Sequence, residues 1–533
     1  MEETGKEQEC QRGLNDSAEI EALGYGPRGL GISRRGVLTG LGALAGAQLM
    51  GPEPAFAARP TTNAAANGAW KHAVGDPRGS AIAVKVGRSQ EGRFGVMFKK
   101  LAEYGPPDTL LRALAARMGE ATSNNPTDLD NPSIPAGFTF LGQFIDHDMT
   151  LDRTPIPEQQ TDPNALTNFD TPLFDLGSIY GRGPTLDPQL YDPNQSGRLL
   201  VVRNAEGVED LPRATDGVAK IGDARNDENL IVSQLHLAFL KFHNRCLTSR
   251  VARSFADAQR LTRWHFQWVI VHDYLRHVAG ENVVARFLMT NGNGKPRVKR
   301  EFYKPKNPHR PMMPVEYSVA AFRFGHSMVR AAYLLHQRNG TASFAPIFGA
   351  PGRDLRGGQA LPARLEIDWK HFFELRGQSS AQRNQSRLID GRLALPLFNL
   401  PSTVVNDAMV SLAERNLIRG KRLGLPSGQA VARAMGVAPL NNAELGMPAP
   451  NDPGWAGEAP LWFYILKESE LLQSGQRLGP VGGRLVTEVI LGILESDKDS
   501  YLNASKVFRP VSPIAPQTGP FTIGDLISFA QSS

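Results

Sequence analysis

The amino-acid sequence predicts a mainly α-helical fold built around three long segments. Residues Phe138–Asp152 are an apolar run with few polar side chains, which indicates a largely buried helix. Leu230–Arg250 is a long amphipathic segment, and Val315–Leu335 repeats apolar side chains at helical spacing. No internal repeat accompanies these segments, so we expect one large body rather than an array of repeated units.

Length and composition limit the class of protein. The chain has 533 residues, of which 41% are hydrophobic and 21% charged, values typical of a soluble globular protein with a sizeable core. Its 39 prolines and 53 glycines indicate many loops. The formal net charge of +6 is modest for this length, and no basic run is interleaved with aromatic residues, so nucleic-acid binding is not expected.

Residues 1–57 predict a twin-arginine signal peptide. Ser33–Leu38 (SRRGVL) precedes an apolar run that continues to Met50, and Ala55–Ala57 (AFA) forms an A-x-A cleavage site. The apolar run is too short to span a bilayer permanently, so we expect no stable membrane anchor. Export of a folded protein to the periplasm or the extracellular space follows. Cys10 leaves with this leader, and the remaining Cys246 predicts a chain without a disulfide.

The remaining segments follow in order. Residues 58–91 are rich in Ala, Asn, Gly and Pro and predict a flexible arm, after which residues 92–533 form the main body. Leu110–Met118 predicts a short amphipathic helix, and Asn124–Pro135, with its prolines, predicts a loop that leads into the next helix. Leu461–Leu502 predicts a loop and one apolar helix that closes the core.

The polar residues within Phe138–Asp152 are the strongest candidate site. Gln143 and His147 are four apart and share a helix face, Asp146 lies on an adjoining part of that face, and Asp148 points elsewhere. An amide, an imidazole and a carboxylate side by side suit acid–base work on a small molecule held over a cofactor. The alternative is a polar face that is merely solvated, but the flanking aromatic and aliphatic residues favour burial.

These residues read Gln, two apolar residues and Asp-His-Asp, and in this the chain resembles the animal-type haem peroxidases of the peroxidase–cyclooxygenase superfamily, in particular its bacterial members. The resemblance implies a mainly α haem peroxidase fold in which haem lies between a distal and a proximal helix. It assigns four roles: His147 as distal acid–base residue, Gln143 in the peroxide and halide pocket, Asp146 at the haem edge, and Asp148 as a calcium ligand.

The segment after this helix predicts the rest of a calcium site. Backbone and side-chain oxygens alternate in the tight loop Thr171–Gly181, as hard cations prefer. The loop resembles the family's calcium loop, which implies Thr171, the carbonyl of Leu173 and Asp175 as ligands beside Asp148. The family commonly has serine where this chain has Gly177, so either Ser178 substitutes for it or this position contributes less.

Arg225 and Glu228 stand three apart before the amphipathic segment Leu230–Arg250. From the residues alone, a structural interpretation, with Arg225 in a surface salt bridge and Glu228 as a first-turn acid, is as good as a functional one. The resemblance implies instead that Arg225 polarises the O–O bond and that Glu228 is the second haem-edge carboxylate, so that ester links to haem b can form. Asn229 replaces the methionine that forms a sulfonium link in some members. We interpret His236 and His243, further along this segment, as packing residues.

His326 lies on the apolar stripe of Val315–Leu335, where an ordinary core histidine is the simplest interpretation. The motif Arg323-Phe324-Gly325-His326, however, resembles the family's proximal motif, which implies His326 as the axial iron ligand and Arg323 as a haem-binding residue. An axial imidazole needs an acceptor for its second ring nitrogen. The resemblance assigns this role to Asn416, which precedes Gly424-Leu425-Pro426 at the family's spacing.

We therefore expect a peroxidase that reduces hydrogen peroxide and oxidises phenols, iodide, bromide or thiocyanate, with haem b and Ca²⁺ as cofactors. Two alternatives remain. A fatty-acid dioxygenase of the same superfamily would use a tyrosine three residues before the proximal histidine, where this chain has Arg323. A haem- or calcium-binding adhesion protein without turnover would not need Gln143, His147 and Arg225 together. The sequence does not determine the oligomeric state.

Overall fold

The computed structural model describes residues 94–120, 129–150 and 172–532, except residues 310, 339, 351, 380, 381, 403, 404, 406, 407, 448–454 and 456. These residues all belong to one unit of the chain, Met50–Ser533. The predicted signal peptide and arm lie outside the described residues, as does Thr171.

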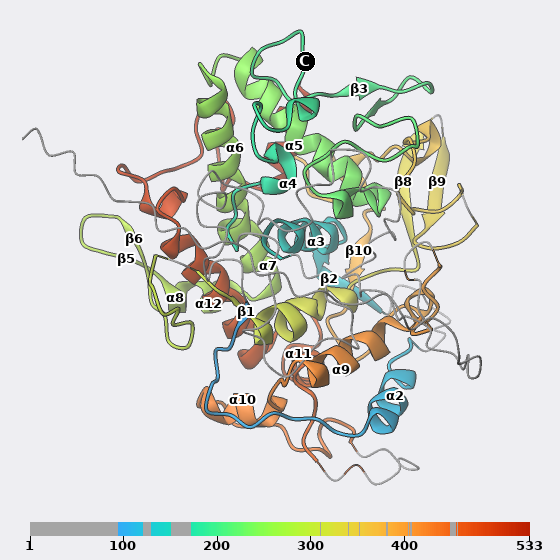
Figure 1. Ribbon diagram of the computed structural model, residues 1–533, viewed down its shortest axis with the longest axis vertical. Helices are drawn as coiled ribbons and strands as arrows, with labels where there is room; N and C mark the ends of the chain where they lie inside the picture. The colour runs from blue at the N-terminus through green and yellow to red at the C-terminus, as the bar shows by residue number, and fades with distance from the viewer. Residues whose placement is uncertain are drawn as a thin grey trace, which may run out of the picture. The chain divides into compact units, whose positions relative to one another are not determined.

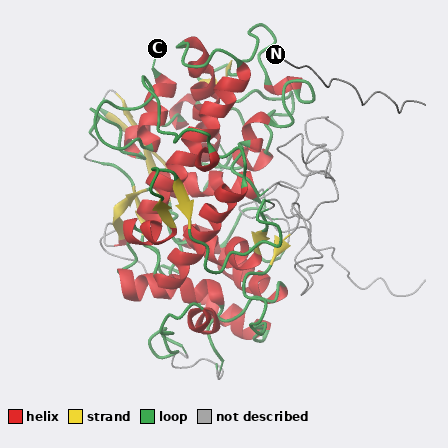
Figure 2. Cartoon of the chain, turned by 90° about the vertical axis from the view of Figure 1, so that its left-hand side faces the viewer, coloured by secondary structure: helices red, strands yellow, loops and turns green. Residues whose placement is uncertain are grey.

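The prediction of a mainly α-helical fold is confirmed, and helices dominate the described part of the chain (Figures 1 and 2). The α-helices are α2 (Asp108–Ala116), α3 (Gly137–Met149), α4 (Gly177–Tyr180), α5 (Leu230–Thr248), α6 (Phe255–Val269), α7 (Leu275–Val278), α8 (Glu281–Phe287), α9 (Leu412–Arg422), α10 (Gly428–Ala434), α11 (Leu461–Gln473), α12 (Pro480–Ser496) and α13 (Ile523–Gln531). Short 3₁₀ turns are η7 (Pro188–Leu190), η8 (Ala224–Asp227), η11 (Ala321–His326), η12 (Ala363–Leu365), η13 (Trp369–His371), η14 (Leu395–Phe398) and η15 (Tyr501–Asn503). Two π-helical turns are η9 (Ile270–Tyr274) and η10 (Glu316–Ala320).

The strands form two-stranded ladders rather than a central sheet. The pairs are β1 (Phe94–Gly95) with β7 (Met313–Pro314), β2 (Asp130–Pro135) with β10 (Gln385–Arg387), β3 (Val202–Arg203) with β4 (Glu209–Asp210), β5 (Leu288–Thr290) with β6 (Pro296–Val298), and β8 (Ala332–Arg338) with β9 (Thr341–Pro346). Only β1 and β7 run parallel among these pairs of the described chain. Such short ladders need the helices around them for stability.

Helix α3 lies in the middle of the helical body and contacts α5, η8, η9 and η11 (Figure 1). All of its residues are buried except Gln143 and Asp146. Two glycines allow close approach to its neighbours: a Cβ on Gly137 would lie 2.5 Å from the Phe373 ring, and one on Gly142 would lie 2.5 Å from the hydroxyl of Tyr274. The buried position predicted for this helix follows from its apolar composition.

The segment Val315–Leu335 differs from the single helix that the sequence predicts. It forms the π turn η10 and the 3₁₀ turn η11, which ends at His326, and the chain then enters strand β8. Gly325, next to the end of η11, weakens regular helix because glycine loses most conformational freedom on folding. Beyond it, the backbone gains ladder hydrogen bonds with β9, which apolar periodicity alone does not reveal.

Two other segments also differ from the prediction. Asp130–Pro135, expected as loop, is strand β2 because it pairs with the distant β10.

The region from Leu461 contains two helices rather than one. Ser474 and Gly475 adopt left-handed φ values of 52° and 68° and end α11, and Pro480 opens α12. The buried carboxylate of Glu468 accepts hydrogen bonds from the first amides of α12, at 2.9 Å from Val481 N and 3.2 Å from Gly482 N.

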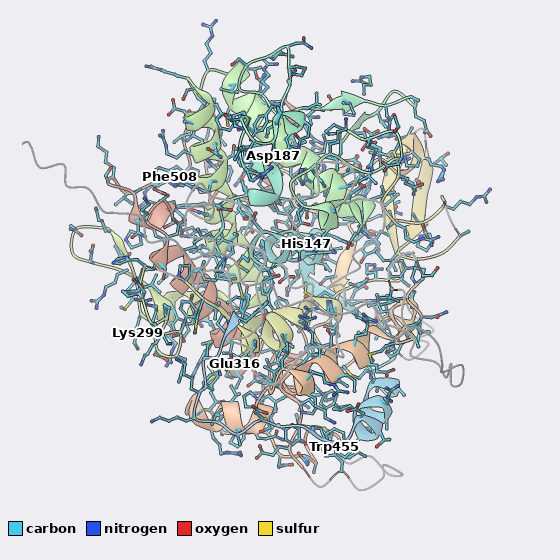
Figure 3. All side chains as sticks on the ribbon, in the orientation of Figure 1. His147, Asp187, Lys299, Glu316, Trp455 and Phe508 are labelled. Carbon is cyan, nitrogen blue, oxygen red and sulfur yellow. The ribbon has the colours of Figure 1, made fainter. Side chains whose placement is uncertain are left out.

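Buried carboxylates also fix the start of the described chain. Glu316 accepts hydrogen bonds from the amides of Met97 and Phe98, each at 2.9 Å, which joins the segment after β1 to the turn η10. Glu316 and His147 are labelled in Figure 3. Among the helices of the described residues, none has the length and apolar character needed to cross a membrane.

Candidate active site

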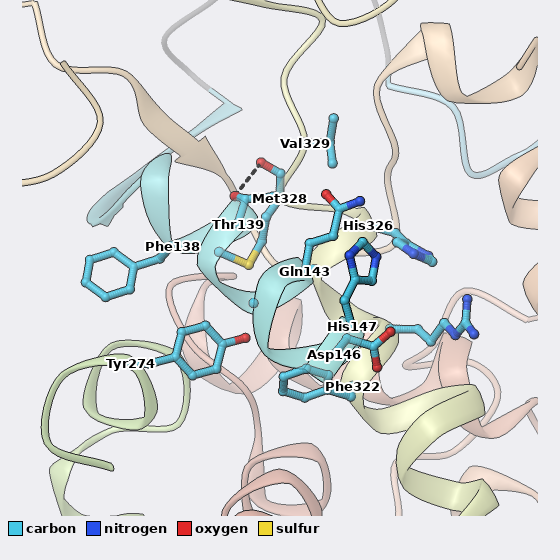
Figure 4. Close-up of a pocket in the computed structure, with 13 residues that line it drawn as sticks. Phe138, Thr139, Gln143, Asp146, His147, Tyr274, Phe322, His326, Met328 and Val329 are labelled. Carbon is cyan, nitrogen blue, oxygen red and sulfur yellow. Dashed lines mark hydrogen bonds between the residues drawn. The ribbon is translucent and has the colours of Figure 1, made fainter. Parts of the chain in front are cut away.

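The predicted site residues of α3 and η11 face a shared cavity (Figure 4). Helix α3 contributes Gln143, Asp146 and His147, and the proximal segment contributes Arg323 and His326. The space between them, counted with its opening to solvent, is about 560 Å³. The structure therefore brings together two histidines that are far apart in the sequence.

The ring of His147 is oriented by a buried asparagine. Its Nδ1 lies 2.9 Å from Oδ1 of Asn226, a residue of turn η8. His147 is 1% exposed and Asn226 is fully buried, so this contact is shielded from water. A buried hydrogen bond is stronger than one exposed to water, so this contact fixes the rotamer of the His147 ring. Nε2 of the ring then points away from Asn226.

Arg225 contacts the backbone of the same histidine. Its Nη2 donates to the carbonyl of His147 at 2.8 Å and to Asp223 Oδ2 at 2.7 Å. Asp223 also caps η8 by accepting a hydrogen bond from the amide of Arg225 at 3.0 Å. The predicted arginine is thus adjacent to His147, although it is not among the residues that line the cavity.

Contacts from Arg213 and Gly357 stabilise turn η8, which contains Arg225 and Asn226. Arg213 forms a two-pronged salt bridge with Asp227, at 2.7 and 2.8 Å. Gly357 packs against the turn so closely that a Cβ there would lie 1.7 Å from the carbonyl oxygen of Asp227. A glycine is therefore required at 357, and the turn is held by a charge-assisted bond and by backbone packing.

Two polar atoms of the predicted site residues lack hydrogen bonds in the described chain. In the structure as described, Gln143 Nε2 and Glu228 Oε2 are buried without a hydrogen bond. Burial raises the pKa of Glu228 well above its usual value, against the opposing effect of Arg225. Loss of hydration likewise raises the pKa of Asp146, a half-buried side chain, and the charges of Arg323 and Arg225 partly offset this effect. Buried polar groups of this kind are explained most directly by a ligand that would complete their bonds.

The proximal histidine is also paired with an asparagine. Nδ1 of His326 lies 2.8 Å from Nδ2 of Asn416, which is 1% exposed, and Oδ1 of the same amide is buried without a hydrogen bond in the structure as described. Burial, followed by the charge of Arg323, lowers the pKa of His326 well below its usual value and keeps the imidazole neutral. Trp462 packs edge-on against the ring and donates to the carbonyl of Arg323 at 3.1 Å. A neutral imidazole binds a metal through Nε2 when Nδ1 carries the proton, and this tautomer requires the Asn416 amide to turn its Oδ1 toward the ring.

The predicted calcium residues are placed in part. Asp148 is buried on the side of α3 away from the cavity and accepts hydrogen bonds from Leu176 N at 2.8 Å and Ser178 Oγ at 3.4 Å. Asp175 accepts from Gly177 N at 3.1 Å, and Leu173 is half-buried. Within the described residues, no three His, Cys, Asp or Glu side chains are grouped to hold a metal ion.

Sequence reasoning overlooked three residues at or near the site. Asn226 is adjacent to the predicted Arg225, and His236, interpreted as a packing residue, contacts Asn226 through Nδ1 at 3.1 Å. Tyr274 lines the cavity from turn η9. A π turn often marks a functional position, but it leaves no signature in the sequence. His243 does pack away from the site, against Tyr180 and Gly197 O.

A mainly helical body in which two buried imidazoles face one cavity has the arrangement of a helical haem oxidoreductase. The chain belongs to the animal haem peroxidase family, whose family model matches residues 133–446.

Known relatives are distant. Thyroid peroxidase of Rattus norvegicus is 23% identical over 393 residues, which cover 64% of this chain and 39% of that protein. Chorion peroxidase of Aedes aegypti is 24% identical over 275 residues, which cover 45% of this chain and 34% of that protein. The chain therefore spans about two fifths or less of the length of these relatives.

Solved structures show the same fold. Peroxidase A from Dictyostelium discoideum has a TM-score of 0.55 at 16% identity, with 77% of this chain and 89% of that chain covered. A fatty acid α-dioxygenase from Arabidopsis thaliana has a TM-score of 0.51 at 15% identity, with 82% of each chain covered.

Proposed function

We propose that this protein is a haem peroxidase that reduces hydrogen peroxide and oxidises small-molecule electron donors. The observation that carries the proposal is the pair of imidazoles at one cavity, each bound through Nδ1 to its own buried asparagine. A proton on Nδ1 places the lone pair of the ring on Nε2, the form that accepts a proton at His147 and would bind iron at His326. At His326 this form requires Oδ1 of Asn416 to face the ring. His326 can then bind iron, while His147 accepts a proton and returns it.

The residues present fit haem. Gln143 lines the cavity, and its Nε2 is a buried polar atom without a hydrogen bond in the structure as described. Glu228 Oε2, which is outside the residues that line the cavity, is likewise buried without one. A Cβ on Gly325, which lines the cavity, would meet nothing within 4 Å, so this wall leaves room for a flat ring. His326 would bind the iron, with Arg323, Asp146 and Glu228 as further haem-binding residues. The two carboxylates allow ester links.

When bound, haem supplies the iron to which peroxide coordinates and the electrons that cleave its O–O bond. The chain supplies proton transfer and charge. His147 would take a proton from one oxygen of the peroxide and return it to the other, which would leave as water. Arg225 is held beside His147 but does not line the cavity. The family resemblance is what supports its role, which would be to stabilise the negative charge that develops on the leaving oxygen. Acid–base assistance of this kind is worth about a hundred- to ten-thousandfold in rate.

The donors we propose are phenols, iodide, bromide and thiocyanate. Asn229 occupies the position where a sulfonium-forming methionine would stand, and its side chain is used as the cap of α5, accepting from Ile231 N at 2.8 Å. Without that sulfur link, we expect no efficient oxidation of chloride at neutral pH.

We also propose calcium as a structural ion. Asp148, Asp175 and Ser178 lie close together in the described chain, with the carbonyl of Leu173 and with Thr171 as further ligands. The ion would fix the end of α3 without contacting peroxide, because Asp148 faces away from the cavity.

The segment before the peroxidase domain suggests where the protein works. The residues Ser33–Leu38 support export by the twin-arginine route, with residues 1–57 as signal, 58–91 as arm and 92–533 as the enzyme. Lysine replacement of Arg34 and Arg35 should abolish export, which fractionation of cells into cytoplasm and exported fractions would measure.

The test of the proposed function is spectroscopic. Purified protein should show a haem absorption band, which persists in the protein after acid–acetone extraction if ester links are present, and peroxide should shift that band. Guaiacol or iodide oxidation should then follow. A protein that binds no haem, or a haem band that peroxide does not change, would refute the proposal.

A second candidate is fatty-acid oxygenation, because the fold matches a fatty acid α-dioxygenase from Oryza sativa with palmitic acid at a TM-score of 0.51. Arg323 stands three residues before His326, where such an oxygenase needs tyrosine, and its Nε donates to Ser318 O at 2.9 Å. Oxygen uptake with palmitic acid would favour this candidate, and its absence would exclude it.

A further inference from the structure

We propose that Asn226 is a positioning residue that holds His147 in the Nδ1–H tautomer, and that His236 anchors the other end of the Asn226 amide. The inference deepens the proposed function and rests on it, because it concerns how the distal histidine is prepared to accept a proton from peroxide.

The three side chains form a continuous line through three elements. Oδ1 of Asn226 in η8 lies 2.9 Å from Nδ1 of His147 in α3. Nδ2 of the same amide lies 3.1 Å from Nδ1 of His236 in α5. Asn226 and His236 are fully buried and His147 is 1% exposed, so water does not compete for these bonds.

The order of atoms fixes the protonation pattern. An amide nitrogen can only donate, so Nδ1 of His236 must carry a lone pair, and the His236 proton sits on Nε2. The amide oxygen can only accept, so Nδ1 of His147 must carry a proton. Nε2 of His147 is then left with a lone pair, which is the form that accepts a proton.

His236 is suited to this anchoring role. Burial lowers the pKa of His236 to about 3, so the ring stays neutral near neutral pH and keeps an acceptor for the amide. Its ring packs edge-on against Phe144, at 6.3 Å between centroids, within the apolar core around α3 and α5. Were the amide reversed, its nitrogen would face His147, and the proton of His147 would move to Nε2.

Position 226 is also well placed mechanically. Arg225, the preceding residue, donates to the carbonyl of His147. Consecutive residues of one short turn therefore hold the ring and the backbone of the same histidine. The Arg213–Asp227 salt bridge and the close contact with Gly357 hold that turn in place. The hydrogen bonds from the turn to the ring and to the carbonyl of His147 are therefore fixed relative to each other.

The experiment compares Asn226→Leu, which removes both hydrogen bonds, with Asn226→Asp, which keeps an acceptor for His147. Asn226→Leu should lower the second-order rate with peroxide about ten- to hundredfold, the usual effect of losing a group that orients a functional histidine. Haem binding should be unchanged. Asn226→Asp should restore the rate to within a few fold of the wild type.

A second readout needs no haem. Nitrogen-15 NMR of histidine-labelled apoprotein, with the His147 signals assigned from the spectrum of His147→Gln, should show a protonated Nδ1 and an unprotonated Nε2 in the wild type. Asn226→Leu and His236→Phe should each give a mixture of tautomers. His236→Phe also keeps the test available if the leucine variant does not fold.

His243→Leu is the matched control. His243 lies on the same helix and is equally buried, but it bonds to Tyr180 and Gly197 O. This variant should leave the His147 signals and the peroxide rate unchanged. Wild-type signals and rate in Asn226→Leu would overturn the inference. A wild-type protein that binds no haem would instead overturn the proposed function, while the NMR result would still decide the tautomer.

Discussion

At the scale of single residues, the ring of His147 is the group on which the proposed chemistry depends most directly. Replacement by glutamine keeps a polar side chain of similar length on α3 but removes the base. We expect the rate of reaction with peroxide to fall about a hundred- to ten-thousandfold, because the proton transfer is lost. Stopped-flow absorbance measures this rate, and an unchanged value would exclude His147 as the acid–base residue.

The proximal pair gives a separate prediction. Asn416→Leu removes the buried amide that contacts His326 Nδ1. Loss of such a partner typically weakens a metal site about ten- to a hundredfold, so hemin affinity should fall by this amount. Titration of apoprotein with hemin gives the affinity. His326→Ala should have a larger effect, and equal effects of the two substitutions would contradict the assigned roles.

Much of the site can be predicted at this scale because its residues form short motifs. Gln143, Asp146 and His147 are close in the sequence, and helical spacing places them on one face. The role of Asn226 is different, since it depends on contacts with His147 and His236, which lie on other elements. A pattern of neighbouring residues carries no information about such a contact.

At the scale of elements, the end of α3 is joined to the loop before α4 by Asp148. Asp148→Ala would leave the buried amide of Leu176 without its acceptor, and we expect the free energy of unfolding to fall by about 1–3 kcal/mol. Calcium chelation should lower the melting temperature of the wild type and have little further effect on the variant. Calorimetry with and without EGTA measures both.

The control for this substitution is Asp216→Ala, which removes an aspartate from an exposed turn. It should change neither stability nor the response to EGTA. If chelation leaves the wild-type melting temperature unchanged, the calcium assignment is wrong, while the prediction for the Asp148 hydrogen bonds still stands.

Elements were predicted well where composition alone sets their structure. The apolar run of α3 and the amphipathic segment of α5 gave helices close to the expected ranges. Val315–Leu335 was predicted as one helix because apolar periodicity does not distinguish a helix from π and 3₁₀ turns followed by a strand. Strand β2 was missed because its partner β10 is remote in the sequence.

At the scale of the whole molecule, stability should depend on pH through buried carboxyl groups. Burial raises the pKa of Glu468 from 4.5 to about 7, so the folded protein favours the protonated form. The folded state then binds more protons than the unfolded state between these values, and the free energy of unfolding falls as the pH rises through this window. One pKa unit is worth about 1.4 kcal/mol, so Glu468 contributes a loss of about 3 kcal/mol.

Glu468→Gln removes this titration while it keeps an oxygen for the amides of α12. Between pH 5 and pH 8, the free energy of unfolding of the wild type should fall by about 3 kcal/mol more than that of the variant. Urea unfolding at the two pH values gives the difference. A wild type and a variant that respond equally to pH would show that Glu468 titrates normally.

The cavity has one wall from α3 and the other from η11, segments widely separated along the chain. An unfolded chain does not bring His147 and His326 together, so a ligand that needs both walls binds the native state alone. At a hundred times its dissociation constant, such a ligand adds about 2.7 kcal/mol to the free energy of unfolding. The cell's supply of haem would then set the lifetime of this protein against proteases as well as its catalytic capacity.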